Sequence, residues 1–220
     1  MVSTVDSPST SLSYLSAHAA TLTERSSSPN QNLLPLTADV SETDHLVIGG
    51  CDVPQLIEQF GSPLYILDEV TLRAACRQYR EAMAQYYPGE SLVIYASKAW
   101  NCLAVCAIAN SEDLGIDVVS AGELRAAVQV GVPSDRIYFH GNNKSVEELE
   151  QGILSGCRIV VDNWFELKAL SHLAHGAGKT VPILLRITPG IECHTHEYIR
   201  TGHLDSKFGF DPDQMDAVFQ

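Results

Sequence analysis

Between residues 92 and 187 the sequence alternates between short apolar runs and longer helix-like segments, and this alternation constrains the fold more than any other feature. The unit repeats roughly every 20–25 residues, which indicates strands that alternate with helices and so a parallel sheet, either doubly wound or closed as a barrel. The expected strands are 92–95, 116–119, 136–139, 158–161 and 183–187, and the expected helices are 99–109, 121–130, 146–154 and 164–175.

The segments after the early strands distinguish between these two parallel folds. None of them contains a G-x-G-x-x-G sequence, which argues against a dinucleotide-binding fold. A barrel remains, but about five βα units are present and a complete barrel takes about 250 residues. Residues 216–220 resemble a helix without a stop signal. We therefore predict an α/β fold that is a partial (β/α)8 TIM-type barrel; the alternative is a smaller sheet.

The part before this alternation divides into two segments. Residues 1–45 are rich in Ser, Thr and Asn, lack a basic stretch followed by an apolar core, and are predicted to be a disordered leader. Residues 46–220 are predicted to form the barrel part. Its first elements should be a strand or turn at 46–50, a helix at 53–60, a strand at 63–68 and a helix that Asp68 or Thr71 caps and that runs to Tyr86.

Composition limits the partners of the chain. Its 220 residues carry a net charge of -13, which argues against nucleic acid and anionic membranes as partners. No apolar run is long enough to predict a transmembrane helix. The six cysteines are scattered without a C-x-x-C pair, so reduced thiols and a cytoplasmic location are expected.

Lys98 stands at the carboxyl end of the first expected strand of the alternating region, between small residues. Lysines are rarely buried without a partner, because removing the ammonium group from water costs free energy. Partial burial here would favour the neutral, nucleophilic amine that Schiff-base chemistry requires. The alternative is a lysine whose ammonium group reaches into solvent.

Asp117 lies within the next apolar strand, where a carboxylate needs a cationic partner, and Lys98 is one candidate. Ser120 and Glu123 come after it with the spacing of a helix capping box, as do Ser145 and Glu148 further along. Polar residues at the ends of the strands of a βα barrel are also where active sites are built. Both interpretations therefore apply to this segment.

Two further strand ends carry polar residues. His140 opens the sequence His-Gly-Asn-Asn-Lys-Ser, which suits a tight turn, and its ring could instead stack on or hydrogen-bond to a ligand. At 162–163, Asp-Asn is most simply explained as a helix cap.

Arg186 lies in an apolar strand and needs an anionic partner, either a carboxylate in a structural ion pair or a ligand anion. The segment 192–203 comes next, with Cys193, His194, His196 and His203. Their spacing matches no standard zinc pattern, so we predict no metal site and favour a substrate-covering loop.

The order of these motifs resembles a known family. The sequence Tyr-Ala-Ser-Lys-Ala around Lys98 resembles the cofactor-lysine motif of the alanine-racemase-like, barrel-type pyridoxal-phosphate decarboxylases. The segment 140–145 is similar to the next motif of the diaminopimelate decarboxylase family in particular, and so are 198–202 and 206–209. The resemblance covers roughly residues 46 to 220.

The resemblance implies a (β/α)8 barrel with a carboxyl-terminal β-domain after it, in a homodimer. It implies that Lys98 holds pyridoxal 5'-phosphate, and that Asp117, His140 and Arg186 line the cofactor pocket. The implied reaction is decarboxylation of the amino acid meso-diaminopimelate to L-lysine, in which the cofactor accepts the electron pair of the broken bond.

Several motifs of that family do not occur in this chain: the histidine that stacks on the cofactor, the glycine-rich phosphate loop and the acidic partner of the pyridine nitrogen. We therefore expect an amino-terminal part of the enzyme, with the rest of the barrel and the β-domain missing. Two alternatives stay open: a non-catalytic cofactor carrier or regulatory pseudo-enzyme, and a related decarboxylase for ornithine, arginine or carboxynorspermidine.

Overall fold

The computed structural model describes residues 33–189 and 208–219 of the chain. The chain divides into two compact units, with the boundary between Leu72 and Arg73 inside helix α3 (Glu69–Tyr86). Each unit has a sheet of its own. Within the described residues, no helix combines the length and apolar character needed to cross a membrane.

From residue 33 on, the first unit contains a small antiparallel sheet, the helix α2 and the first residues of α3. The strands pair in the order β1-β2-β3, with Asp39 opposite Val47 and Ile48 opposite Cys51. Asp52 caps the next helix, because its Oδ1 accepts a hydrogen bond of 3.0 Å from the Gln55 N–H. The elements are β1 (Asp39–Val40), β2 (Leu46–Ile48), β3 (Cys51–Asp52) and α2 (Val53–Phe60).

The predicted helix 53–60 is confirmed, and the predicted strand 63–68 is wrong: this segment has no strand partner in the described structure. Asp68 is the cap of the next helix, as its Oδ2 accepts from the Thr71 N–H at 3.0 Å. Strand β1 lies inside the range 1–45 that we expected to be a leader, so ordered structure begins before residue 46. Residues 1–32 lie outside the described part.

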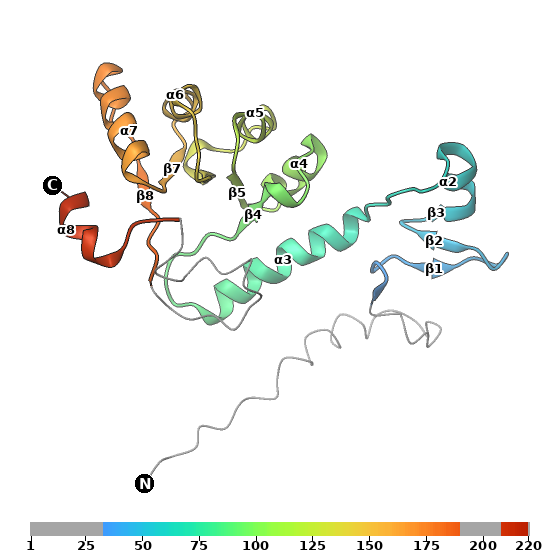
Figure 1. Ribbon diagram of the computed structural model, residues 1–220. Coiled ribbons are helices and arrows are strands. Elements are labelled where there is room, and N and C mark those ends of the chain that lie inside the picture. Colours follow the sequence, from blue (N-terminus) through green and yellow to red (C-terminus); the bar gives the residue numbers. More distant parts are fainter. Residues whose placement is uncertain (1–32, 190–207, 220) are drawn as a thin grey trace, which may run out of the picture. The chain divides into compact units, whose positions relative to one another are not determined.

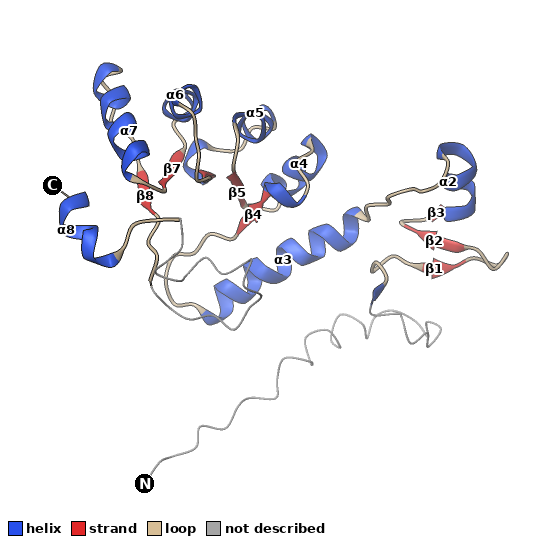
Figure 2. Ribbon diagram, viewed as in Figure 1, coloured by secondary structure: helices blue, strands red, loops and turns tan. Residues whose placement is uncertain are grey.

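The second unit is a five-stranded parallel sheet in the order β4-β5-β6-β7-β8, with a helix after each of the first four strands (Figures 1 and 2). Figure 1 shows α4 to α7 side by side along one face of this sheet. The strands are β4 (Ile94–Ala96), β5 (Gly115–Val118), β6 (Ile137–Phe139), β7 (Arg158–Val161) and β8 (Ile183–Leu185), and the helices are α4 (Leu103–Ser111), α5 (Ala121–Gln129), α6 (Val146–Ser155), α7 (Trp164–Gly176) and α8 (Met215–Val218).

This unit confirms the predicted α/β fold with a parallel sheet, consistent with part of a TIM-type barrel. Every strand and helix predicted from the alternation is present, and no end differs from its predicted position by more than four residues. The largest shift is at α4, which begins at Leu103 because a 3₁₀ turn, η2 (Ser97–Ala99), comes first. That turn contains Lys98.

The core of the second unit lies between the sheet and its helices. Alternate residues of β5, β6 and β7 are fully buried, as expected when successive side chains point to opposite faces. The residues between them, such as Asp117 and Tyr138, are only half-buried and form the other face. The buried set is Ile116, Val118, Ile137, Phe139, Ile159 and Val161, each 0% exposed.

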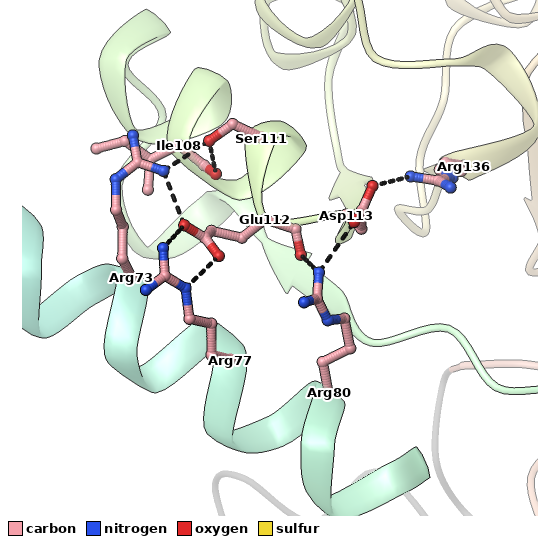
Figure 3. Close-up of polar contacts among 8 residues, drawn as sticks. All are labelled: Arg73, Arg77, Arg80, Ile108, Ser111, Glu112, Asp113 and Arg136. Carbon is pink, nitrogen blue, oxygen red and sulfur yellow. Dashed lines mark hydrogen bonds and ion pairs between the residues drawn. The ribbon is translucent and has the colours of Figure 1, made fainter. Parts of the chain in front are cut away.

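Ion pairs fasten the second-unit part of α3 to the loop between α4 and β5 (Figure 3). Arg77 donates two hydrogen bonds to Glu112, of 2.7 Å and 2.8 Å, and Arg73 donates a third of 2.9 Å. Arg80 donates to the Glu112 carbonyl and to Asp113. The Glu112 side chain is only 6% exposed, so this cluster anchors α3 through a buried carboxylate and is not an exposed surface ion pair. It lies at the amino end of β5, away from the strand ends that carry the polar motifs.

Candidate active site

The four predicted site residues stand at or near the carboxyl ends of four strands of the parallel sheet, and therefore along one edge of it. Lys98 lies in η2 directly after β4, and Asp117 is the third residue of β5. His140 comes directly after β6 and Arg186 directly after β8. We call this edge the rim.

Lys98 itself is exposed, so the partial burial considered from the sequence is not present in this structure. Its neighbour Ser97 is 0% exposed. The Ser97 hydroxyl lies 2.8 Å from both the Asp117 carbonyl oxygen and the Glu123 Oε2. The buried contacts of Ser97 thus fix the backbone next to Lys98, while the Lys98 side chain stays accessible.

Asp117 faces His140 across two adjacent strands. Asp117 Oδ1 lies 3.5 Å from His140 Nδ1, and the two side chains are 22% and 35% exposed. Among the described residues the ion-pair partner of Asp117 is therefore this histidine, and the pairing with Lys98 considered from the sequence is not found. The Nε2 of the same imidazole is buried and has no hydrogen-bond partner in the described part of the chain. A buried polar atom without a partner is costly, which marks this position as one that a ligand can complete.

Arg186 is held by a carboxylate. Its Nη1 donates to Asp162 Oδ1 at 2.7 Å, and the Asp162 side chain is 1% exposed. The guanidinium also lies over the Phe208 ring, 4.6 Å from its centre. Of the two partners that the sequence left open for Arg186, the structure contains the carboxylate.

Lys144 and Glu166 form a buried pair that we did not single out from the sequence. Their charged atoms are 3.1 Å apart, and both side chains are 1% exposed. Lys144 Nζ also donates to the carbonyls of Gly141 and Val160, at 2.6 Å and 2.8 Å. Burial lowers the pKa of Lys144, and the charge of Glu166 opposes that shift. The pair holds the turn after His140 against β7.

One of the two predicted capping boxes is complete and the other is half formed. At α6, the Ser145 hydroxyl accepts from the Glu148 N–H and the Glu148 carboxylate accepts from the Ser145 N–H. At α5, Ser120 accepts from the Glu123 N–H, but the Glu123 carboxylate accepts from Val119 N–H instead of that of Ser120. Glu123 is thereby available to contact Ser97.

The predicted substrate loop and the histidines considered for zinc, including His194, His196 and His203, lie outside the described residues. Within the described ranges, no group of three or more His, Cys, Asp or Glu side chains is arranged to hold a metal ion.

Comparison with known proteins assigns the class. The sequence pattern of the family described as "Pyridoxal-dependent decarboxylase, pyridoxal binding domain" matches residues 70–220. This range holds the whole parallel sheet and all four predicted site residues. The chain belongs to this family of pyridoxal-dependent decarboxylases.

Curated relatives point to one branch of the family. The chain is 63% identical over 205 residues to a diaminopimelate decarboxylase of Synechocystis sp., which covers 90% of this chain and 44% of the relative. It is 46% identical over 177 residues to the diaminopimelate decarboxylase of Bacillus subtilis, which covers 80% of this chain and 40% of the relative. The chain therefore spans less than half the length of these relatives.

Solved structures agree with the sequence comparison. Diaminopimelate decarboxylase from M. jannaschii superimposes with a TM-score of 0.75 at 34% identity, over 83% of this chain and 44% of that one. The Helicobacter pylori enzyme in complex with L-lysine gives a TM-score of 0.71 at 31% identity, over 76% and 42%.

Proposed function

We propose that this chain is the cofactor-binding part of a pyridoxal-phosphate-dependent decarboxylase that converts meso-diaminopimelate to L-lysine. The observation that supports this proposal best is the 63% identity to a diaminopimelate decarboxylase over 90% of the chain, which includes Lys98 and its rim. A homodimer in the cytoplasm is part of the proposal and rests on the family resemblance.

The rim has groups that suit pyridoxal phosphate. The cofactor has an aldehyde, which an accessible primary amine can hold covalently, and Lys98 presents that amine at the end of β4. It also has a flat aromatic ring with polar substituents, and the unpartnered Nε2 of His140 lies buried two strands away. The residues present fit the group on these two counts.

Each residue then has a role that its surroundings support. Lys98 holds the cofactor through Nζ, while Ser97 fixes its backbone. Asp117 and His140 form one side of the cofactor pocket, and their contact orients both side chains. Arg186 completes the rim after β8, held by Asp162. When bound, the cofactor supplies the electron sink for loss of carbon dioxide.

The test uses a completed protein, which we define as this chain joined to the carboxyl-terminal part of the Synechocystis relative. We expect release of carbon dioxide and formation of L-lysine from meso-diaminopimelate, and visible cofactor absorbance that is lost in Lys98→Ala. Glu150→Ala, an exposed carboxylate on α6, is the control variant.

Other results would overturn parts of the proposal. Turnover of ornithine, arginine or carboxynorspermidine in preference to meso-diaminopimelate would indicate a related decarboxylase. Borohydride-fixed cofactor without carbon dioxide release from any of these amino acids would indicate a carrier or pseudo-enzyme. Cofactor absorbance that survives in Lys98→Ala would exclude Lys98 as the covalent anchor.

A further inference from the structure

Three successive helices of the second unit begin in the same way. In each, the side chain of the capping residue accepts a hydrogen bond from the backbone N–H three residues on, and that third residue is a glutamate. Each glutamate carboxylate binds the backbone N–H of its capping residue or of the residue before it. Each also binds a group from the preceding strand–helix connection or, for Glu148, from the first residue of the preceding helix. The capping pairs are Ser120 with Glu123, Ser145 with Glu148, and Asn163 with Glu166.

The first contact joins the loop after β5 to the turn that carries Lys98. Glu123 Oε2 accepts from the Val119 N–H at 2.7 Å and from the Ser97 hydroxyl at 2.8 Å. Ser97 is fully buried, and its hydroxyl has one hydrogen for two acceptors, the Asp117 carbonyl and the Glu123 carboxylate. The hydrogen bond to the carboxylate is the stronger of the two, because its acceptor is charged.

The second contact joins the loop after β6 to the start of α5. Glu148 Oε2 accepts from the Ser145 N–H at 3.0 Å, and its Oε1 accepts from the Ala121 N–H at 2.9 Å. One carboxylate therefore satisfies N–H groups at the amino ends of two neighbouring helices, α5 and α6.

The third contact joins the loop after β7 to the turn after His140. Glu166 Oε2 accepts from the Asp162 N–H at 2.9 Å and lies 3.1 Å from the Lys144 ammonium, while its Oε1 accepts from the Lys144 N–H at 3.2 Å. Asp162 in turn pairs with Arg186, so the series of contacts extends to the strand end at β8.

We propose that three carboxylates, those of Glu123, Glu148 and Glu166, form a ladder of positioning residues around the rim, and that Glu123 sets the direction of Lys98 through Ser97. The inference rests on the proposed function for its account of the cofactor lysine. It deepens that function by naming residues that do not touch the cofactor themselves but hold the loops that carry the cofactor-binding residues.

The ladder explains why the loops are ordered without burial of the lysine. Lys98 is exposed and belongs to a single 3₁₀ turn, which has little stability of its own. The buried contact behind it supplies the rigidity, and the amine keeps its access to a ligand. Pre-organisation of this kind is what a group that must meet one atom of a cofactor requires.

The experiment measures how fast pyridoxal phosphate becomes fixed to Lys98 by borohydride in the completed protein, at a cofactor concentration below saturation. The variants are Glu123→Ala, Ser97→Ala and their combination. Glu123→Gln keeps an oxygen acceptor at the same place, and Glu150→Ala removes an exposed charge from the same unit. Hydrogen exchange of the amides of 97–100 is measured in parallel without cofactor.

We expect Glu123→Ala and Ser97→Ala each to slow fixation by about tenfold, as loss of one hydrogen bond to a charged group implies. The double variant should be slowed by less than the product of the two single effects, because both single variants remove the contact between Ser97 and Glu123. Glu123→Gln should retain most of the rate. Amides 97–100 should exchange faster in the alanine variants, and Glu150→Ala should change neither measurement.

Multiplicative effects in the double variant, or unchanged exchange at 97–100 in folded Glu123→Ala, would overturn the ladder. Failure of the proposed function looks different. A completed protein that fixes the cofactor but releases no carbon dioxide refutes the decarboxylase and leaves the ladder measurable. A protein that fixes no cofactor refutes the cofactor site, and the exchange of amides 97–100 still decides whether Glu123 holds the turn.

Discussion

The ammonium of Lys144 lies 3.1 Å from the carboxylate of Glu166, and each side chain is 1% exposed. In the described structure the Lys144 ammonium contacts Glu166, the carbonyls of Gly141 and Val160, and the Phe139 ring. A buried charge keeps its cost down only while such partners are present. The pair is therefore a structural element of the rim, and loss of either partner should lower the free energy of unfolding.

We expect Lys144→Met and Glu166→Gln each to destabilise the completed protein by about 3–5 kcal/mol, because each leaves the other group buried without its counter-charge. Replacing both residues at once, as Lys144→Met with Glu166→Gln, should cost less than the sum of the single changes. Urea unfolding measures all of them. Lys168→Met, on the same helix as Glu166, is the control; equal losses there would contradict the prediction.

Acid should weaken the anchor of α3 (Figure 3). Hydrogen bonds from Arg77 and then Arg73 lower the pKa of Glu112 from its ordinary 4.5 to about 2. The folded chain therefore binds fewer protons here than the unfolded chain between these two values. The stabilisation is complete above about pH 4.5 and disappears as the pH falls towards about 2.

Glu112→Gln removes this dependence, so the variant should be less stable than the parent near neutral pH. The difference in melting temperature between them should narrow as the pH falls from about 6 to about 3. A gap that stays constant over that range would show that the charge of Glu112 is not what Arg77 stabilises. Arg80→Lys, which perturbs the more exposed pair with Asp113, serves as the comparison.

The turn after β6 requires glycine at position 141. Gly141 has φ of +111°, and a Cβ there would lie 3.3 Å from the Val119 carbonyl oxygen. Gly141→Ala should therefore be strained both by its backbone conformation and by this close contact, and should lower the free energy of unfolding by about 1–3 kcal/mol. We expect it to displace His140 as well, so cofactor fixation should slow more than in Gly131→Ala. Gly131 also has positive φ, but a Cβ there would meet nothing within 4 Å.

The order of strands and helices could be predicted from the sequence because each element has its own periodicity and punctuation. Three helix caps could be predicted from the sequence, and the structure has them at the predicted positions: Asp68, Ser145 and Asn163. The strand expected at 63–68 fails because apolar content does not supply a partner strand. Pairing is a property of the assembled sheet.

The rim residues could be located at strand ends, but their partners could not. Asp117 meets His140 from the next strand, and Arg186 meets Asp162, because neighbouring strands bring together residues more than twenty positions apart. Glu166 was missed altogether, although Asn163-x-x-Glu166 has the spacing of the two capping boxes that we did recognise. The third repeat of this spacing after a strand was the signal that could have identified Glu166 as a capping residue.

Arg186 and Asp162 provide a test that separates a structural ion pair from a ligand contact. The Asp162 carboxylate is 1% exposed and the guanidinium is 25% exposed, so the carboxylate is the more costly of the two to leave alone. Arg186→Met should destabilise the completed protein by about 3 kcal/mol, and Asp162→Asn by less, because the amide keeps one acceptor oxygen. If the pair is their main interaction, the double variant should lose no more than Arg186→Met alone, and urea unfolding of the four proteins measures this. Additive losses would mean that Arg186 and Asp162 stabilise the protein independently of each other. Cofactor fixation that is slower in folded Arg186→Met than in the control Lys168→Met would then support a contact between Arg186 and the cofactor.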